Sequence, residues 1–286
     1  MESKAIDPAG IRETQHRNWD SAAAGWKAWS EFNGRADHHI SERLVELAGV
    51  RPGGRVLDVA AGSGEPALTA ARRAGPEGRV VATDISAEML AFGRERAAAA
   101  GLGNVEFVES DASSLDFPQG SFDAAVSRWG IIFEPDAEAA AGRIRGFLEP
   151  GGRMAIASWG EPDQVPFLSI PMRTTMERLG VSPPPAGTPG PLSRPTPAAL
   201  AGLLEGGGFA DVTVEQGEVT FEFDSPEHFT TYVRAIAAPI RAMIEQHAGA
   251  DEEEAWNAIT RAAADAGGGS GPLSFTNVVL LASGTG

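Results

Sequence analysis

Cysteine is absent from the 286 residues of this chain, which removes disulfides, thiolate metal ligands and thiol catalysis together. Basic residues are also scarce, because 23 lysines and arginines stand against 39 aspartates and glutamates and give a formal net charge of −16. No basic stripe interrupts this acidity, so we expect no nucleic-acid partner. No apolar run approaches the roughly 20 residues that a membrane-spanning helix needs, so we expect no membrane span.

The first 20 residues are polar and mixed in charge, which is not the pattern of a signal peptide. Together with the missing cysteine, this favours a cytoplasmic protein. A hydrophobic content of 42% against 22% charged residues is typical of a globular chain. None of these features decides the oligomeric state, and a homo-oligomer is compatible with all of them.

Between residues 55 and 159 short apolar segments alternate with helical patterns. The expected strands are "RVLDVA", "GRVVATDI", "NVEFVESDA", "FDAAVSRW" and "RMAIASW". Such alternation predicts an α/β fold with a parallel sheet and helices on both faces. Ligands of these sheets bind at the carboxyl ends of the strands, near the point where the strand order reverses.

The flanking regions are expected to be largely helical. Residues 1–50 predict helices on which Trp19, Trp26 and Trp29 share one face, with Gly25 as an interruption. The proline-rich stretch 181–197 predicts a loop or lid. Further elements are expected as follows: a short helix from Thr196 to the glycines at 206–208, strands over 211–223 and 274–284, and helices over 225–249 and 251–267.

The stretch "DVAAGSGEPA" raises the question of the ligand. Its Gly62-x-Gly64-x-x-Ala67 fits the dinucleotide fingerprint, and Asp84 follows Gly62 by 22 residues, as a ribose-binding acid would. However, Asp58 lies near the end of the first strand, where its carboxylate would face the diphosphate of a nicotinamide cofactor. A carboxylate at this position suits an ammonium group better.

Aspartates also stand at the carboxyl ends of the next two strands. Asp84 ends the second strand, where a carboxylate can accept hydrogen bonds from a ribose diol. Asp111 and Ala112 follow the third, where an acid and a backbone N–H can bind an adenine edge. A ligand with an amino-acid head, a ribose and an adenine would contact all three acids, and S-adenosylmethionine is such a ligand.

With these residues in place, four ordered segments resemble the motifs of class I S-adenosylmethionine-dependent methyltransferases. They are "VLDVAAGSGEPAL", "VVATDISAEML", "VEFVESDASSLDFPQGSFDAAVSRW" and "FLEPGGRMAIASW". The likeness is greatest to the small-molecule group related to the ubiquinone/menaquinone C-methyltransferases, and it covers about residues 56–159. The earlier "NWDSAAAGW" resembles the segment that covers the cofactor in that group.

The resemblance implies a Rossmann-like, doubly wound, mostly parallel seven-stranded sheet with helical cap insertions. It also implies which residues contact the cofactor. The methionine part would contact Asp58, Ala60, Gly62 and Gly64, the ribose would contact Asp84 and Ile85, and the adenine would contact Asp111 and Ala112. Ser127 would lie beneath the cofactor and Trp26 over it. Ala60 stands where the family more often has glycine. Glu65 and Pro66 after Gly64 are unusual, and the resemblance gives Glu65 no role.

The acceptor pocket is expected after the fourth strand, with Trp129, Ile131 and Phe133 in its wall and residues 160–195 and 225–265 around it. Among the histidines, His228 lies one helical turn before Tyr232, on a helix that Ser225 can cap at its start. If the acceptor must lose a proton, these two are the candidate catalytic residues. His16, His38, His39 and His247 are more typical of the surface, and the histidine spacing predicts no metal site.

These observations predict a methyltransferase that acts on a small, largely apolar acceptor, mainly by positioning it in line with the methyl group. The expected organisation is a helical cover over 1–50, an S-adenosylmethionine-binding core over 51–160, and lid or cap segments with the last two strands of the same domain over 161–286. Two other hypotheses remain open. One is a nicotinamide-dependent oxidoreductase, and the other is a non-catalytic S-adenosylmethionine-binding protein.

Overall fold

The structure of the chain is a computed structural model that describes residues 8–185 and 187–286. The described residues form a seven-stranded sheet in the order β3-β2-β1-β4-β5-β7-β6. Its strands are β1 (Arg55–Val59), β2 (Arg79–Asp84), β3 (Val105–Glu109), β4 (Phe122–Arg128), β5 (Leu148–Trp159), β6 (Ala210–Phe223) and β7 (Leu273–Thr285).

Strands β1 to β5 run parallel, whereas β7 is antiparallel to both β5 and β6. The strand order reverses between β1 and β4, because the chain moves outward to β3 and then returns to the other side of β1. This confirms the predicted doubly wound, mostly parallel sheet. The expected binding edge is therefore the carboxyl end of β1 and β4.

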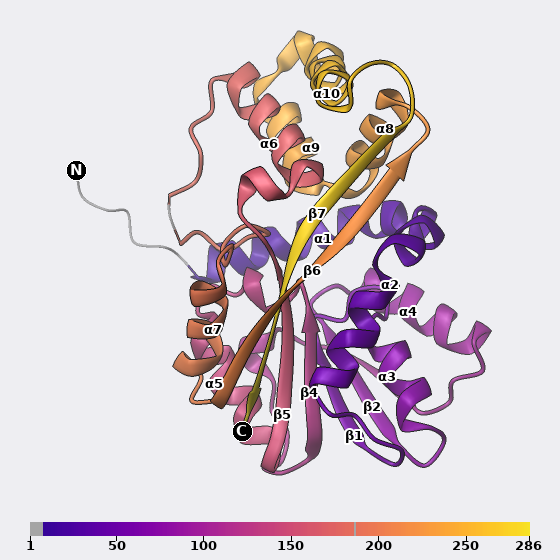
Figure 1. Cartoon of the computed structure of the whole chain (residues 1–286), viewed down its shortest axis with the longest axis vertical. Coiled ribbons are helices and arrows are strands. Elements are labelled where there is room, and N and C mark those ends of the chain that lie inside the picture. The colour runs from indigo at the N-terminus through magenta and orange to yellow at the C-terminus, as the bar shows by residue number, and fades with distance from the viewer. Residues whose placement is uncertain (1–7, 186) are drawn as a thin grey trace.

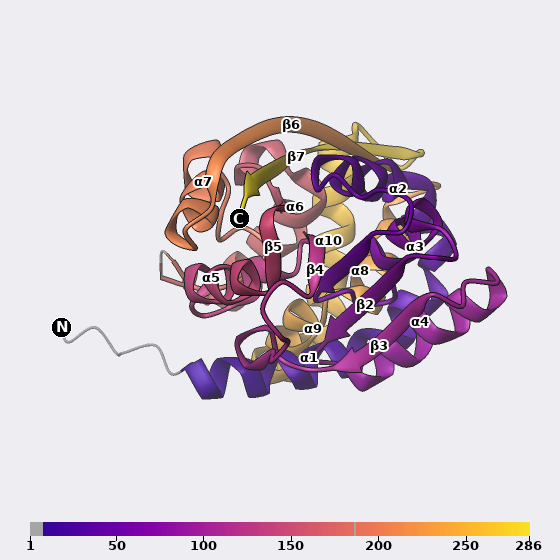
Figure 2. The same cartoon turned by 90° about the horizontal axis from the view of Figure 1, so that it is seen from below.

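Helices cover both faces of the sheet. The helices α2 (Ser30–Leu47), α3 (Ala67–Ala74), α4 (Ala87–Ala99), α5 (Ala137–Phe147) and α7 (Pro197–Gly206) pack beside the strands (Figures 1 and 2). Because successive side chains of a strand point to opposite faces of the sheet, neighbouring residues of β1 enter different cores. Val56 packs in the core that includes α2 and α3, and Leu57 packs in the core that includes α5 and α7. Ser86 and Thr196 cap α4 and α7, since each hydroxyl accepts a hydrogen bond from a backbone N–H in the first turn of the helix it precedes.

The last two strands extend beyond the rest of the sheet. Within β7, residues 279–285 are the part that pairs with β5. The earlier part of β7 pairs with β6 alone, and the two form a two-stranded ribbon. Around this ribbon lie α6 (Pro166–Leu179), α8 (Pro226–Ile236), α9 (Ala238–His247) and α10 (Glu252–Gly267), which we call the helical lobe (Figure 1).

The helical lobe differs from the sequence prediction in two respects. The helix expected over 225–249 is two helices that meet at Ala237, because Pro239 has no N–H to continue the helical hydrogen bonds. Helix α6 was not predicted. The expected loop over 181–197 has no helix or strand in its described residues until α7 begins.

Helix α1 (Pro8–Ala28) contacts α4 on one side and α8 and α9 on the other, so it lies between the sheet and the helical lobe. The predicted interruption at Gly25 is wrong, since α1 runs through it and the chain breaks at Trp29 instead. A Cβ at Gly25 would lie 2.1 Å from the carbonyl oxygen of Ala235. The glycine therefore permits a close approach of α1 to α8.

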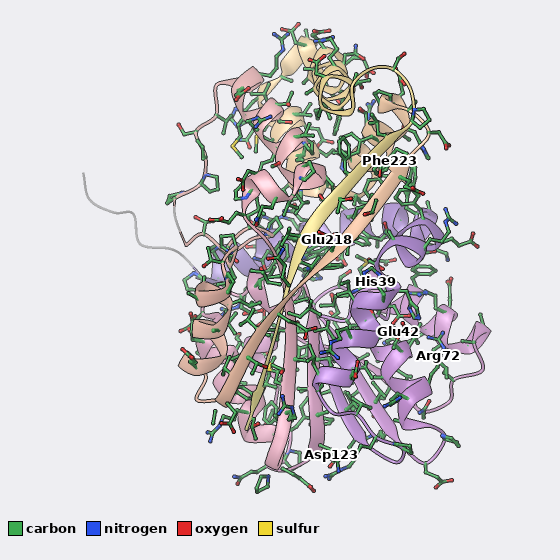
Figure 3. All side chains as sticks on the ribbon, viewed as in Figure 1. His39, Glu42, Arg72, Asp123, Glu218 and Phe223 are labelled. Carbon is green, nitrogen blue, oxygen red and sulfur yellow. The ribbon has the colours of Figure 1, made fainter. Side chains whose placement is uncertain are left out.

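The surface of α2 also contacts β6. Figure 3 shows His39 on α2 beside Glu218 on β6, where a ring nitrogen of His39 lies 2.9 Å from the backbone oxygen of Glu218. Arg43 pairs with Glu215 on the same strand at 2.6 Å. Along the described chain, none of the helices combines the length and apolar character needed to cross a membrane.

Candidate active site

Asp58, on β1, is fully buried at the strand-order reversal. Neither carboxylate oxygen has a hydrogen-bond partner among the described residues. Burial raises the pKa of Asp58 well above its ordinary value, and the nearby Ala67 amide opposes this only in part. A buried carboxylate without a partner is costly, which marks this position as one that a donor or a cation would stabilise.

The loop after β1 turns through left-handed backbone. Ala60, Gly62 and Gly64 have φ angles of 57°, 54° and 102°. At Ala60 this conformation is unusual for a residue with a side chain. A Cβ built on Gly62 would have no heavy atom within 4 Å, so space lies open on that side of the loop. The loop thus leaves room for a ligand beside its backbone.

Glu65, which the resemblance left without a role, anchors this loop. Its buried carboxylate accepts a hydrogen bond from Thr69 at 2.7 Å and lies 3.5 Å from Arg96. Arg96 in turn donates to the backbone oxygen of Ser63 at 2.8 Å. Glu65 therefore holds the loop against α4.

Asp84 ties the loop to the end of β2. Its two oxygens accept hydrogen bonds from the backbone N–H of Gly62 at 2.8 Å and of Ser86 at 2.9 Å. Burial raises the pKa of Asp84 to about 6, although these hydrogen bonds lower it. Since a carboxylate can accept about four hydrogen bonds, Asp84 retains capacity for ligand hydroxyls. Ile85 beside it is half-buried.

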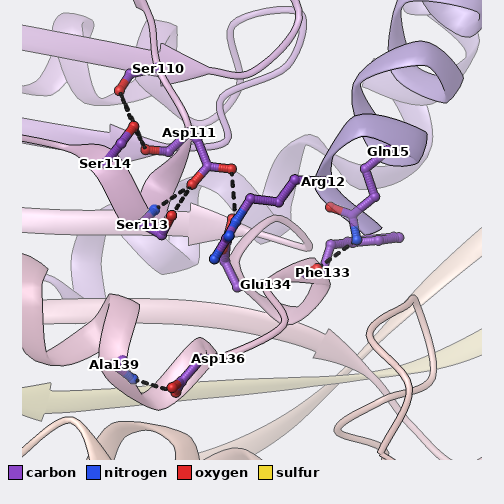
Figure 4. A network of polar contacts seen from close by, with 10 residues as sticks. All are labelled: Arg12, Gln15, Ser110, Asp111, Ser113, Ser114, Phe133, Glu134, Asp136 and Ala139. Atoms are coloured by element: carbon purple, nitrogen blue, oxygen red, sulfur yellow. Dashed lines mark hydrogen bonds and ion pairs between the residues drawn. The ribbon is translucent and has the colours of Figure 1, made fainter. Parts of the chain in front are cut away.

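Asp111 caps the short turn after β3, where Ala112 is buried. One of its oxygens accepts from the backbone N–H of Ser113 at 2.8 Å, and the other lies 3.4 Å from Arg12 of α1. Arg12 also reaches Glu134 at 3.8 Å, so it stands between two acids (Figure 4).

This cluster has an unusual charge balance. Burial and the charge of Asp111 raise the pKa of Glu134 to about 7, and Arg12 opposes this shift. One oxygen of Glu134 is buried without a hydrogen-bond partner in the described part of the chain. Sequence reasoning missed both Arg12 and Glu134, because their interaction depends on how α1 crosses the strand ends.

Ser127 connects β1 and β4. Its hydroxyl donates to the backbone oxygen of Val59 at 2.8 Å and accepts from the N–H of Ile131 at 3.0 Å. Ile131 is fully buried in the core, and Phe133 contacts Trp19 of α1 at a centroid distance of 5.4 Å. Of the three expected pocket residues, Ile131 thus lies in the core and Phe133 lies under α1.

Trp129 follows β4 with a φ of 55°, and two groups contact its ring. Its ring stacks on Trp159 at 4.4 Å, with 4° between the planes. The guanidinium of Arg128 lies over the ring at 4.9 Å. Arg128 is itself paired at 2.8 Å with Asp37 of α2.

The three amino-terminal tryptophans do not share one face. Trp19 and Trp26 contact each other on α1 at 6.3 Å, whereas Trp29 stands at the helix break and contacts Tyr232 of α8 at 5.1 Å. The predicted single face is wrong because α1 ends at Ala28. The indole N–H of Trp26 is buried with no acceptor on the residues described.

His228 and Tyr232 lie on one face of α8, behind the predicted cap Ser225. Tyr232 is fully buried and donates its hydroxyl hydrogen to Asn33 at 2.8 Å. Burial, with Asp37 nearby, raises the pKa of Tyr232 well above its ordinary value. His228 is half-buried, and its ring nitrogen accepts from the backbone N–H of Asp224 at 3.1 Å.

The residues predicted to bind the cofactor therefore come together at the carboxyl ends of β1, β2, β3 and β4, with α1 across them. His228 and Tyr232 lie on α8 in the helical lobe, where both rings contact Trp29 and Phe32. A surface groove of about 780 Å³ lies at the amino ends of β2 and β3, away from these motifs. In the described ranges, no group of three or more acids and histidines has the arrangement of a metal site.

Comparison with known proteins shows what the core of this chain resembles. A family model described as a methyltransferase domain matches residues 56–152. The ubiquinone/menaquinone biosynthesis C-methyltransferase UbiE of Pseudomonas putida is 38% identical over 144 residues, which are 50% of this chain and 56% of the relative. The enzyme of that name from Teredinibacter turnerae is 36% identical over 144 residues, 50% of this chain and 58% of the relative. The chain thus spans a little over half the length of these curated relatives.

Solved structures support the same fold. Phosphoethanolamine N-methyltransferase 2 of Haemonchus contortus, in complex with S-adenosyl-L-methionine, has a TM-score of 0.58 at 18% identity, covering 98% of this chain and 60% of that one. The [4+2]-cyclase SpnF has a TM-score of 0.54 at 20% identity, covering 86% of this chain and 80% of that one. The motif residues and these relatives agree: residues 56–152 match a methyltransferase domain, and over about half its length the chain is similar to the ubiquinone/menaquinone C-methyltransferases.

Proposed function

We propose that this protein binds S-adenosylmethionine and transfers its methyl group to a small, largely apolar acceptor. The observation that carries the proposal is the buried carboxylate of Asp58, which has no hydrogen-bond partner in the described residues and lies on β1, just before the loop in which the Gly62 turn is open. An ammonium group would satisfy it. The diphosphate of a nicotinamide cofactor would add repulsion at the same place.

The other strand-end acids fit the rest of the cofactor. Asp84 has acceptor capacity left for two ribose hydroxyls, and Asp111 and Ala112 stand at the next strand end for an adenine edge. The cofactor would supply an activated methyl group on a sulfonium. The work of the protein is then to hold the acceptor in line and to exclude water, which α1 supports by crossing the strand ends.

The acceptor would enter from the side of Trp129 and the helical lobe. Aromatic and aliphatic side chains dominate that region, which suits a molecule with little charge. The curated relatives are named for C-methylation in ubiquinone/menaquinone biosynthesis, and an acceptor of related character is part of this proposal. The fold alone does not define the reaction, since a [4+2]-cyclase has the same fold.

Isothermal titration calorimetry tests the cofactor assignment. We expect binding of S-adenosylmethionine and S-adenosylhomocysteine and no binding of NAD. Binding of NAD alone would instead support the oxidoreductase hypothesis. To separate an enzyme from a cofactor-binding protein, a small molecule that co-purifies should be identified by mass spectrometry and should gain 14 mass units (CH₃ in place of H) on incubation with S-adenosylmethionine.

Asp58→Asn provides a sharper test of the observation itself. Because the carboxylate is buried without a partner, the ligand-free variant should be more stable than the wild type at pH 8. The same variant should bind S-adenosylmethionine more weakly, because the amide cannot pair with an ammonium group. Reduced stability together with unchanged affinity would refute the assigned role of Asp58.

A further inference from the structure

Helix α2 carries polar residues on its buried face. Asn33, Asp37 and Ser41 follow one another at intervals of one helical turn, and their side chains lie among apolar neighbours such as Ile40 and Leu44. Buried polar groups are costly unless each finds a partner. The partners of Asn33 and Asp37 therefore indicate what this face of α2 does, whereas the Ser41 hydroxyl has no hydrogen-bond partner among the described residues.

A first series of contacts leads from α2 to the ends of β4 and β5. Asp37 pairs with Arg128 at 2.8 Å, and both side chains are at most one-tenth exposed. The Arg128 guanidinium lies over the Trp129 ring, and Trp159 stacks on the same ring. These two contacts hold the indole of Trp129 in place.

A second series returns to α2 through the helical lobe. Trp159 contacts Phe167 of α6 at a centroid distance of 5.3 Å, and Phe167 contacts Tyr232 of α8 at 6.3 Å. Tyr232 donates to the side-chain oxygen of Asn33 at 2.8 Å. These contacts close on themselves, so the residues form one connected series that joins α2 to the ends of β4 and β5 and to the helical lobe. We call them the contact ring: Asn33, Asp37, Arg128, Trp129, Trp159, Phe167 and Tyr232.

Two N–H groups of the contact ring lack acceptors. The side-chain nitrogen of Asn33 and the indole nitrogen of Trp129 are buried with no hydrogen-bond partner within the described residues, and Asn33 is only 6% exposed. Tyr232 occupies the oxygen of Asn33, which leaves the amide N–H groups as the free part of that side chain. A buried donor without an acceptor costs about 1–3 kcal/mol, so a ligand oxygen here would remove a penalty that the ligand-free protein bears.

The charges around the contact ring limit the kind of oxygen. Asp37 and Arg128 neutralise each other, and the nearby Asp58 is an acid without a partner. A carboxylate ligand would therefore add an uncompensated negative charge, whereas a neutral hydroxyl or carbonyl oxygen would not. The aromatic members of the ring favour an apolar body for the rest of the ligand.

We infer that the contact ring is the subsite for the methyl acceptor and that it selects an apolar molecule with a neutral hydroxyl or carbonyl oxygen, which accepts hydrogen bonds from Asn33 and Trp129. This inference rests on the proposed function and names the acceptor class that the same site takes. Asn33 and Trp129 are then the residues that determine specificity. The Asp37–Arg128 pair and Trp159 hold these donors in place.

Three probes of similar shape test this selection: 4-ethylphenol, ethylbenzene and 4-ethylbenzoate. Each is titrated into the full chain saturated with S-adenosylhomocysteine, and binding is followed by tryptophan fluorescence. We expect 4-ethylphenol to bind about three- to tenfold more tightly than either of the others, as one or two net hydrogen bonds would give. Equal binding of all three probes, tighter binding of the benzoate, or no binding of the phenol would overturn the inference.

Two variants locate the selection. Asn33→Leu and Trp129→Phe each remove one donor and keep an apolar side chain of similar shape, so each should lower the preference for the phenol about threefold or more. Trp129→Phe keeps the hydrogen bond between Tyr232 and Asn33, so this variant tests the selection even if Asn33→Leu does not fold. Ser41→Ala is the matched control, because it removes a buried hydroxyl from the same helix outside the contact ring and should leave the preference unchanged. A preference that survives both donor variants would also overturn the inference.

S-adenosylhomocysteine binding, measured on the same preparations, separates this inference from the proposed function. If the cofactor product binds but the probes are not distinguished, the acceptor class is wrong and the methyltransferase proposal stands. If S-adenosylhomocysteine does not bind to the wild type, the proposed function itself fails.

Discussion

The carboxylate of Asp84 accepts a hydrogen bond from the backbone N–H of Gly62 at 2.8 Å, across 22 residues of sequence. The acid that the sequence assigns to a ribose therefore also holds the glycine loop that would carry the methionine part. One side chain links two subsites, and a substitution there affects both the loop and the ligand.

Replacing Asp84 by Asn should lower the affinity for S-adenosylmethionine by at least about tenfold, because a charged acceptor of hydroxyl hydrogen bonds becomes neutral. The amide oxygen can still accept from the N–H of Gly62, whereas the amide NH₂ cannot accept from the N–H of Ser86, so one of the two backbone hydrogen bonds is lost. Calorimetry measures the affinity, and circular dichroism checks the fold. Asp123→Asn, at the amino end of β4, is the control and should leave binding unchanged. An unaltered dissociation constant in Asp84→Asn would exclude the ribose role.

Glu134 should make stability depend on pH. Its pKa lies at about 7 in the folded protein against an ordinary value of 4.5, so the folded state holds a proton that the unfolded state has released. The stabilisation of the folded state by the protonated Glu134 carboxyl is therefore complete below about pH 4.5 and is lost as pH rises through 7. In magnitude this loss is up to about 3 kcal/mol.

Glu134→Gln isolates this effect. Relative to the wild type, the variant should gain unfolding free energy between pH 5 and pH 8, as measured by urea denaturation at each pH. Taking the difference between the two proteins removes the contribution of Asp84, which has the same sign at a pKa of about 6. Arg12→Met should instead raise the pKa of Glu134 further, because the Arg12 charge lowers it. Parallel pH profiles for the wild type and Glu134→Gln would contradict the prediction.

Gly25 and Gly34 form a matched pair within the amino-terminal helices. A Cβ at Gly25 would lie 2.1 Å from a backbone oxygen of α8, whereas a Cβ at Gly34 meets nothing within 4 Å. Gly25→Ala should therefore lower the free energy of unfolding by about 1–3 kcal/mol. Gly34→Ala should raise it by about 0.5–1 kcal/mol, since alanine is the better helix former. Thermal and urea denaturation compare them, and the same sign for both would refute the α1–α8 packing.

His228 and Tyr232 remain candidates for proton removal, and the structure suggests how to test them. Tyr232 has a raised pKa and donates to Asn33, so it is a poor base, and Tyr232→Phe should cost about 1 kcal/mol of stability. Once an acceptor is known, His228→Ala should be assayed from pH 6 to 9. We expect no change in the pH profile, because positioning dominates. A loss of turnover in His228→Ala that varies with pH would show base catalysis instead.

Much of the core could be predicted because its signals are local. Strand ends, helix caps and glycine turns depend on residues a few positions apart, so Asp58, Asp84 and Asp111 could be assigned to successive strand ends. The cap at Ser86 follows from the same physics. The break before Pro239 was also a local signal, and the prediction of one continuous helix missed it.

Only the tertiary structure decided which distant groups meet. Asn33 and Tyr232 lie 199 residues apart, and the pairs of Asp37 with Arg128 and of Arg12 with Asp111 are likewise non-local. Nothing in the neighbouring sequence selects such partners, because their proximity depends on how α1, α2 and α8 pack across the strand ends. The sequence alone determined the motifs of the core and their order. The cover over the strand ends and the contact ring arise from burial and close packing, which bring together groups from the two ends of the chain.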